Sequence, residues 1–280
     1  MNVFAFFVAL LPVPVASVPA AVATVPANVA VAAAPQHAVP EHAVPEHAVP
    51  AREFVLIPAG THVPFYGDGT SEAIEAFELD RYPVTQHDFL QFLAGNPQWR
   101  RDRIRPAFAD EGYLRDWPAP MRPSDPAAPA VGTSWFAARA FCAATGGRLP
   151  TTAEWEYVAA ANGERRDASR DAAFRALVLE LHTRPRPERL PTVGSGAANW
   201  YGIHDLHGFV REWVLDFNSV MMSDDSRGTG SDAQLYCAAA ASTARDASDY
   251  AAFLRYSFRA SLSGRSTHRN LGFRCARSVQ

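Results

Sequence analysis

The sequence predicts an α+β domain of irregular, loop-rich build. Short apolar runs separated by turn residues follow one another from Arg52 onward, and a few segments among them carry the signals of helix starts. Self-similarity with a period of 20 to 50 residues is not found, which argues against a repeat architecture. We therefore expect one domain over residues 52–280, with a length that can bury a sizeable core.

The N-terminal segment differs in composition from the rest of the chain. Residues 4–16 form an apolar run of signal-peptide length that is too short to span a bilayer, although no Lys or Arg precedes it. We predict a signal peptide over residues 1–20, with an uncleaved membrane anchor as the alternative. Residues 21–51 consist largely of Ala, Val and Pro and predict an extended linker. Three evenly spaced histidines there could hold a soft metal ion, but repeat slippage explains them more simply.

The first elements of the domain are expected to be two neighbouring strands. Residues 53–57 read as a strand that Pro58 and Gly60 terminate, and residues 76–84 supply its neighbour. Thr85 is followed three residues later by an acid, which predicts a helix start.

Two further helices are predicted close together. One begins at Ser134 and ends at Gly146, with Cys142 on its buried face. The other begins at Thr151, which forms a capping box with Glu154.

Residues 162–192 are charged and rich in arginine. One stretch within them is amphipathic, with Phe174, Leu177, Val178 and Leu181 on a shared face. We interpret the segment as a surface insertion. Its charges could bind a partner, but a solvated face is the more usual role of such a run.

The charge balance excludes some classes of partner. The formal net charge is -3 at pH 7, so no overall basic field attracts nucleic acid or an anionic membrane. We therefore expect no nucleic acid partner and no membrane contact beyond the signal sequence.

Three motifs in order resemble those of formylglycine-generating enzymes, the sulfatase-modifying factor family. Residues 147–157 read GRLPTTAEWEY, residues 199–213 read NWYGIHDLHGFVREW and residues 270–276 read NLGFRCA. Shorter matches at residues 57–60 and 82–85 extend the resemblance over nearly all of the domain. The resemblance implies a variant of the C-type-lectin-like fold that is low in regular secondary structure.

The second motif also implies a structural calcium site. The family's ligand positions correspond to Asp205, Gly208, Val210 and Glu212, which offer two carboxylates and two backbone carbonyls as hard oxygen donors. An acid pair without a metal is the alternative. His204 and His207 flank Asp205, but two histidines near one acid are weak evidence for a transition metal.

The cysteines argue against the family's oxidase chemistry. Formylglycine-generating enzymes bind Cu(I) between two cysteines, and the corresponding segment here, residues 238–274, contains none. Aligned on the family's Arg-Tyr pair, the two positions hold Ser248 and Phe253, so we expect no catalytic cysteine and no copper at that site.

The remaining cysteines have other expected roles. Cys142 and Cys275 match the family positions that form a disulfide, which an exported protein can form. Cys237 is then the odd thiol, either buried or reactive.

The sequence therefore predicts a periplasmic or secreted relative of formylglycine-generating enzymes without the oxidase cysteines. We expect it to act as a binding or maturation factor for a protein or extended peptide client. Residues 249–256 resemble a subgroup associated with copper nitrite reductases, which points to a copper or denitrification enzyme as the client. An enzyme of altered chemistry, such as a protein-modifying oxidase, and a lectin-like binding module remain the alternatives.

Overall fold

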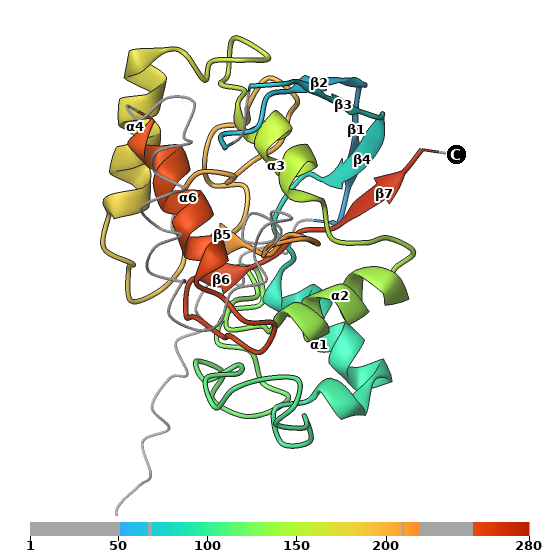
Figure 1. Ribbon diagram of the computed structural model, residues 1–280. Helices are drawn as coiled ribbons and strands as arrows, with labels where there is room; N and C mark the ends of the chain where they lie inside the picture. The colour runs from blue at the N-terminus through green and yellow to red at the C-terminus, as the bar shows by residue number, and fades with distance from the viewer. Residues whose placement is uncertain (1–50, 67–68, 209, 219–248, 280) are drawn as a thin grey trace, which may run out of the picture. The chain divides into compact units, whose positions relative to one another are not determined.

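The computed structural model describes residues 51–66, 69–208, 210–218 and 249–279. Cys237, Ser248, the predicted signal peptide and nearly all of the linker lie outside these residues. Regular elements are short and joined by long loops (Figure 1), as the sequence predicts.

A small antiparallel sheet holds the N-terminal strands together with the end of the chain. β1 (Phe54–Ile57) pairs with β4 (Phe77–Asp80), which also pairs with β7 (Ala276–Ser278), so the strand order is β1-β4-β7. The predicted neighbour of the first strand is thereby confirmed. Two further strand pairs are β2 (Gly60–His62) with β3 (Glu72–Ile74) and, in parallel, β5 (Arg211–Glu212) with β6 (Leu271–Gly272).

The predicted helix starts are confirmed. Thr85 and Thr151 form capping boxes at the starts of α1 (Gln86–Gly95) and α3 (Thr152–Ala159), and Ser134 caps α2 (Trp135–Ala144). A 3-10 turn, η1 (Pro97–Trp99), follows α1. In each capping box the side chains satisfy backbone N–H groups that a helix start leaves free.

Two helices lie beside each other on one flank of the domain. α4 (Ala172–Thr183) is capped by Asp171 and α6 (Tyr250–Ala260) by Asp249. Figure 1 shows α4 and α6 side by side, away from the three-stranded sheet. This pair of helices forms one side of the cavity described below.

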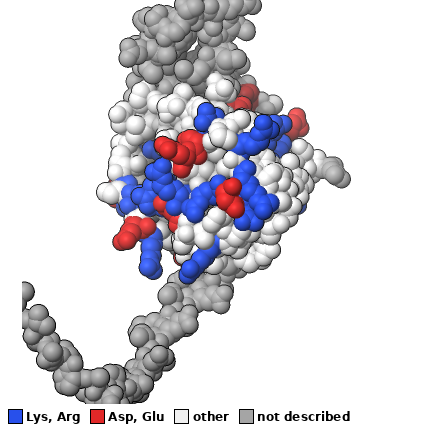
Figure 2. Space-filling view, turned by 90° about the horizontal axis from the view of Figure 1, so that it is seen from below, with Lys and Arg blue, Asp and Glu red and all other residues white. Residues whose placement is uncertain are grey.

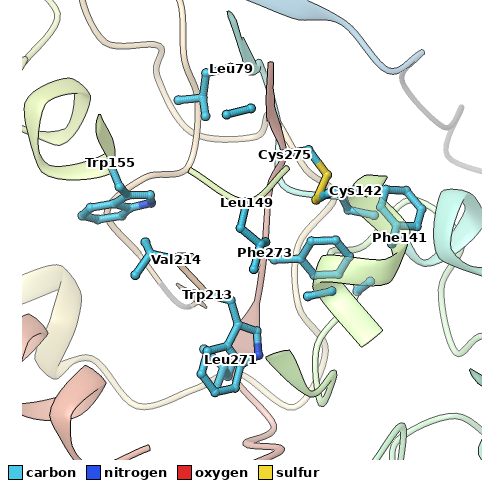
Figure 3. Close-up of a cluster of buried hydrophobic side chains, with 14 of the residues drawn as sticks. Leu79, Phe141, Cys142, Leu149, Trp155, Trp213, Val214, Leu271, Phe273 and Cys275 are labelled. Atoms are coloured by element: carbon cyan, nitrogen blue, oxygen red, sulfur yellow. A yellow bond between two sulfur atoms is a disulfide. The ribbon is translucent and has the colours of Figure 1, made fainter. Parts of the chain in front are cut away.

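Aromatic side chains of distant segments meet in the core. Trp213, Phe141 and Phe273 are almost completely buried, and the rings of Phe141 and Phe273 lie 5.4 Å apart in an edge-to-face arrangement (Figure 3). The indole N–H of Trp213 donates to the carbonyl of Thr133 over 2.8 Å, so its polar atom is satisfied.

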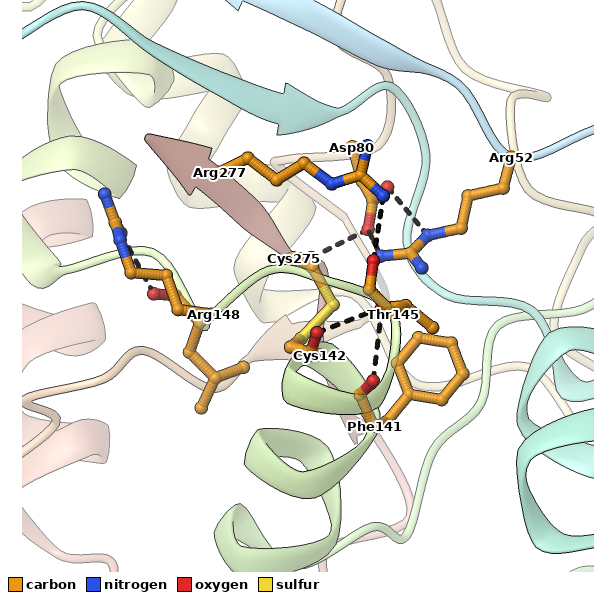
Figure 4. The surroundings of a disulfide bond; sticks show 9 residues. Arg52, Asp80, Phe141, Cys142, Thr145, Arg148, Cys275 and Arg277 are labelled. Atoms are coloured by element: carbon orange, nitrogen blue, oxygen red, sulfur yellow. Dashed lines mark hydrogen bonds and ion pairs between the residues drawn. A yellow bond between two sulfur atoms is a disulfide. The ribbon is translucent and has the colours of Figure 1, made fainter. Parts of the chain in front are cut away.

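A disulfide joins Cys142 of α2 to Cys275 beside β7 (Figure 4). The backbone N–H of Cys275 donates to the buried carboxylate of Asp80 over 2.8 Å, and Arg52 pairs with the same carboxylate. Burial nevertheless raises the pKa of Asp80 above its ordinary value. The disulfide therefore attaches the last strand to α2, and the adjacent Arg52–Asp80 pair attaches the segment before β1 to β4.

The surface carries both signs of charge. The sequence contains no lysine, so every basic side chain in Figure 2 is an arginine, and acidic side chains lie among them on that face. Within the described residues, no helix has the length and apolar character needed to cross a bilayer.

Candidate functional site

One residue from each of the three motifs meets at a single buried carboxylate. Glu212 of β5 accepts the indole N–H of Trp155 over 2.7 Å and the Nε of Arg274 over 2.8 Å. The side chains of Arg274 and Glu212 are 0% and 1% exposed. The parallel pairing of β5 with β6 places Glu212 opposite Gly272, two residues before Arg274. The motifs are thus joined by a buried ion pair, which is their structural role in this chain.

The two carboxylates of the predicted calcium site already have protein hydrogen-bond partners. Both oxygens of Glu212 already accept hydrogen bonds from Arg274, and one of them also accepts from Trp155. The backbone of Asp205 has a positive φ of 58°. Its carboxylate accepts hydrogen bonds from the backbone N–H groups of Gly194 over 2.5 Å and Gly196 over 3.2 Å. A calcium ion at Glu212 would have to compete with the guanidinium of Arg274 for the same carboxylate. The calcium site at Asp205, Gly208, Val210 and Glu212 therefore stays a prediction.

A cavity of about 240 Å³ lies between β2, α3, α4 and α6, and we call it the α4–α6 cavity. Its walls combine charged side chains with five phenyl or phenol rings, those of Phe65, Tyr157, Phe174, Tyr201 and Tyr256. Gly60 makes room for one of them, because a side chain at this position would overlap the hydroxyl of Tyr157.

A buried carboxylate stands in the wall of the α4–α6 cavity. Glu156 of α3 pairs with Arg255 over 2.7 Å and with Arg259 over 2.6 Å, both from α6. Burial raises the pKa of Glu156, but the two guanidinium groups outweigh this and hold the pKa well below its usual range. Glu156 is therefore a fixed anion that anchors α6 to α3, and it is a poor candidate for a general base.

Two imidazoles lie together at the α4–α6 cavity, and one of them, His207, lines it. The rings of His182 and His207 are 5.9 Å apart, and the Nε2 of His207 lies 2.8 Å from the carbonyl oxygen of Ala159, where it can donate. Burial, with the charge of Arg255 next, lowers the pKa of His207 to about 4 and that of His182 to about 3. Both rings are therefore neutral at physiological pH. The Nδ1 of His207 and both nitrogens of His182 are buried without a hydrogen-bond partner.

Arginines outnumber acids at the rim of the α4–α6 cavity. Arg166 and Arg170 line it and are exposed, and the exposed Asp167 lies between them. The neighbouring Arg165 pairs with Asp171 at the start of α4. The arginine-rich segment is thus more than a solvated insertion, since α4 packs on α6 and closes one side of the α4–α6 cavity. The expected shared apolar face is correct for buried Val178 and wrong for Leu177, which is 48% exposed.

The remaining predicted site residues have clear positions. Cys142 and Cys275 form the disulfide, so neither is available as a metal ligand. Phe253, at one of the two family cysteine positions, lies on α6 and packs against an aromatic cluster with Phe65 and Tyr256. The Nδ1 of His204 lies 2.8 Å from the carbonyl oxygen of Gly196, where it can donate a hydrogen bond.

The ion pairs in the wall of the α4–α6 cavity were not predicted from the sequence. Arg255 and Arg259 are four residues apart, a spacing that places both on one face of a helix. That spacing was a usable signal for an anion partner. Glu156 could not be chosen as this partner, because it lies 99 residues away from Arg255 in the sequence.

Comparisons with known proteins cover most of the chain. Residues 40–279 match the Sulfatase-modifying factor enzyme 1-like domain. The chain is 26% identical over 269 residues to Inactive C-alpha-formylglycine-generating enzyme 2 of Mus musculus, covering 79% of this chain and 82% of that protein. It is also 31% identical over 163 residues to serine/threonine-protein kinase pkn1 of Chlamydia pneumoniae, covering 51% of this chain and 23% of the kinase. The chain thus spans about a quarter of the length of that kinase.

Two solved structures are similar at lower identity. One is CarF, at a TM-score of 0.47 and 16% identity, covering 82% of this chain and 99% of that one. The other is PvdO from Pseudomonas aeruginosa, at a TM-score of 0.45 and 19% identity, covering 81% and 94%.

Proposed function

Because the chain belongs to the Sulfatase-modifying factor enzyme 1-like family, we propose that it is a non-oxidase member that binds a protein client through an extended peptide segment. The observation that carries the proposal is the α4–α6 cavity, which has aromatic walls and a basic rim while its buried carboxylate is already neutralised by two arginines. Such a site can hold a ligand, and its buried carboxylate is not free to act as a base.

The size of the α4–α6 cavity supports a peptide segment over a larger ligand. Its volume of about 240 Å³ is below the roughly 300–1,000 Å³ of most small-molecule sites. One or two side chains fill such a space, and the rest of an extended segment lies outside it. Exposed Arg166 and Arg170 at the rim favour a segment that carries acidic side chains.

The non-oxidase part of the proposal is supported by the position of Phe253. Cu(I) in this family needs two thiolates, and a phenyl ring in an aromatic cluster offers no ligand. The relative from Mus musculus is itself named an inactive enzyme, which agrees with loss of the reaction elsewhere in the family.

A conversion assay tests the non-oxidase part. The protein is incubated with Cu(I), O₂, a thiol reductant and a peptide that contains Cys-x-Pro-x-Arg, and the products are analysed by mass spectrometry. We expect no formylglycine above a control without protein. Conversion well above that control would show an active oxidase and refute the proposal.

A binding assay tests the role of the α4–α6 cavity. Fluorescence anisotropy compares extended peptides that carry Asp or Glu with the same peptides carrying Lys, on the wild type and on Arg170→Glu. We expect the acidic peptides to bind more tightly and to lose at least tenfold in affinity in Arg170→Glu. The matched control is Arg184→Glu, an exposed change at the end of α4 outside the cavity lining. Equal losses in both variants would refute the site.

The finer parts of the proposal concern fold, location and client. We assign the fold to the formylglycine-generating-enzyme variant of the C-type-lectin-like fold, which the short strands and long loops support. We also propose that the protein is exported and that a copper nitrite reductase is its client, from the resemblance at residues 249–256. The test is the copper content of that reductase when it is produced with and without this protein. Equal copper content would argue against this client.

A further inference from the structure

A second, much smaller cavity lies beneath α6, and we call it the arginine cavity. Its volume is about 20 Å³, and Arg211, Arg255 and Arg259 line it together with His182, Trp155 and Phe258. It is distinct from the α4–α6 cavity, although Arg255 borders both. A space of this size holds one particle about as large as a water molecule.

Arg211 is the unbalanced charge of the arginine cavity. Arg255 and Arg259 share the carboxylate of Glu156. The fully buried Arg274 occupies Glu212, the only carboxylate that lines the cavity. Among the described residues, no carboxylate forms an ion pair with Arg211. Its guanidinium instead lies over the ring of Phe258, 4.4 Å from the ring centroid.

Unused hydrogen-bond donors are also present in the arginine cavity. The Nη1 of Arg211 is buried without a hydrogen-bond partner, and so are both ring nitrogens of His182. A buried charged donor without a partner is destabilising. Asp249 lies near Arg255 on the far side, where it caps α6, so it does not relieve Arg211.

We propose that the arginine cavity binds a small monovalent anion of the halide class, with chloride as the natural candidate. The Nη1 of Arg211 donates to the ion, and the His182 ring supplies a second donor in one of its tautomers. The neighbouring guanidinium groups of Arg255 and Arg259 favour a negative charge over a neutral water molecule. They also oppose a metal cation at His182, although two imidazoles stand together there. The cavity is too small for sulfate or phosphate.

Thermal unfolding tests the proposal with chloride itself as the probe. Sodium gluconate is replaced stepwise by sodium chloride at constant ionic strength. We expect the Tm of the wild type to rise by about 5 °C, because a ligand that binds only the folded state stabilises it. Arg211→Gln should remove the rise, and Arg184→Gln, an exposed change on the same flank, should keep it. Equal Tm values of the wild type in the two salts would overturn the proposal.

Crystals soaked in sodium bromide give a readout that does not need a variant. We expect an anomalous peak within hydrogen-bonding distance of Arg211 Nη1. A fully occupied water at this position, with no anomalous signal, would overturn the proposal. A Tm rise with Zn²⁺ or Cu(I) that His182→Leu removes, without any effect of chloride, would also overturn it in favour of a two-histidine metal site.

Discussion

Replacement of Glu212 by Gln should destabilise the whole domain, whether or not calcium is present. The change keeps the size of the side chain but leaves the guanidinium of Arg274 buried and without its counter-ion. Removal of one partner from a buried ion pair costs about 3–5 kcal/mol. Four N–H···O contacts to the carboxylate are lost or weakened, three from Arg274 and one from Trp155.

Urea unfolding followed by tryptophan fluorescence measures this effect. For a domain of this size the loss corresponds to a fall in Tm of roughly 10 °C. The control Glu180→Gln breaks an exposed pair on α4 and should change stability by less than about 0.5 kcal/mol. The measurement is made in EDTA and again in calcium.

Two outcomes would refute this reasoning. A loss of less than about 1 kcal/mol in EDTA would show that the pair with Arg274 contributes little. A large loss that appears only in calcium would show that Glu212 holds a calcium ion and that Arg274 gives way to it. The structure predicts the same loss in both buffers, because both carboxylate oxygens are already occupied.

Three further predictions concern the disulfide, the second ion pair and the histidines. Cys142→Ser should lower the free energy of unfolding by about 2–5 kcal/mol, measured by urea unfolding without reductant, because the bridge closes a long loop. Glu156→Gln should lower it by about 3–5 kcal/mol, since Arg255 and Arg259 are left buried without a carboxylate. The lowered pKa of His182 predicts stability that is complete above pH 6.5 and falls as the pH drops toward about 3. In gluconate buffer, His182→Leu should reduce this pH-dependent loss of unfolding free energy by about 2 kcal/mol.

Each of these predictions has a control. Reductant should destabilise the wild type and leave Cys142→Ser unchanged, and an equal effect on both would contradict a disulfide role. For the ion pair of Glu156, Glu180→Gln is again the control. Equal losses of unfolding free energy in Glu156→Gln and Glu180→Gln would contradict a stabilising role of the buried pair. For His182, the free energy of unfolding at each lower pH is compared with its value at pH 8, where the ring is neutral in both the folded and the unfolded chain. An unchanged slope in His182→Leu would show that another group titrates there. Charges facing this ring are Arg255, Arg211 and Glu156, together with the His207 imidazole.

The helix starts could be predicted because their chemistry is local. A capping box needs only residues three positions apart, so Thr85 and Thr151 are recognisable without tertiary contacts. The first strand pair could be predicted for a similar reason, because apolar runs and turn residues mark its strands in the sequence. The disulfide could be predicted only from the family resemblance, because no local sequence signal indicates that Cys142 pairs with Cys275.

The candidate site was harder to predict because its residues meet through long-range packing. Glu212 looks like a metal ligand beside Asp205 in the sequence, but its partner Arg274 lies 62 residues away. The role of α4 was underestimated for the same reason, since an arginine-rich run reads as solvated until its contact with α6 is known. Composition alone cannot show which of two acids meets a guanidinium.

The disulfide has a consequence for how breaks in the chain would be seen. Cys142 and Cys275 are 133 positions apart, so most of the domain lies between them. A protease that cuts once at any peptide bond in this interval leaves two fragments that stay covalently joined. Such a nicked molecule keeps the mass of the intact chain, apart from one added water, on a gel run without reductant, and it separates into two bands only after reduction. Limited proteolysis of this protein therefore reports its cleavage sites only when each digest is run under both conditions.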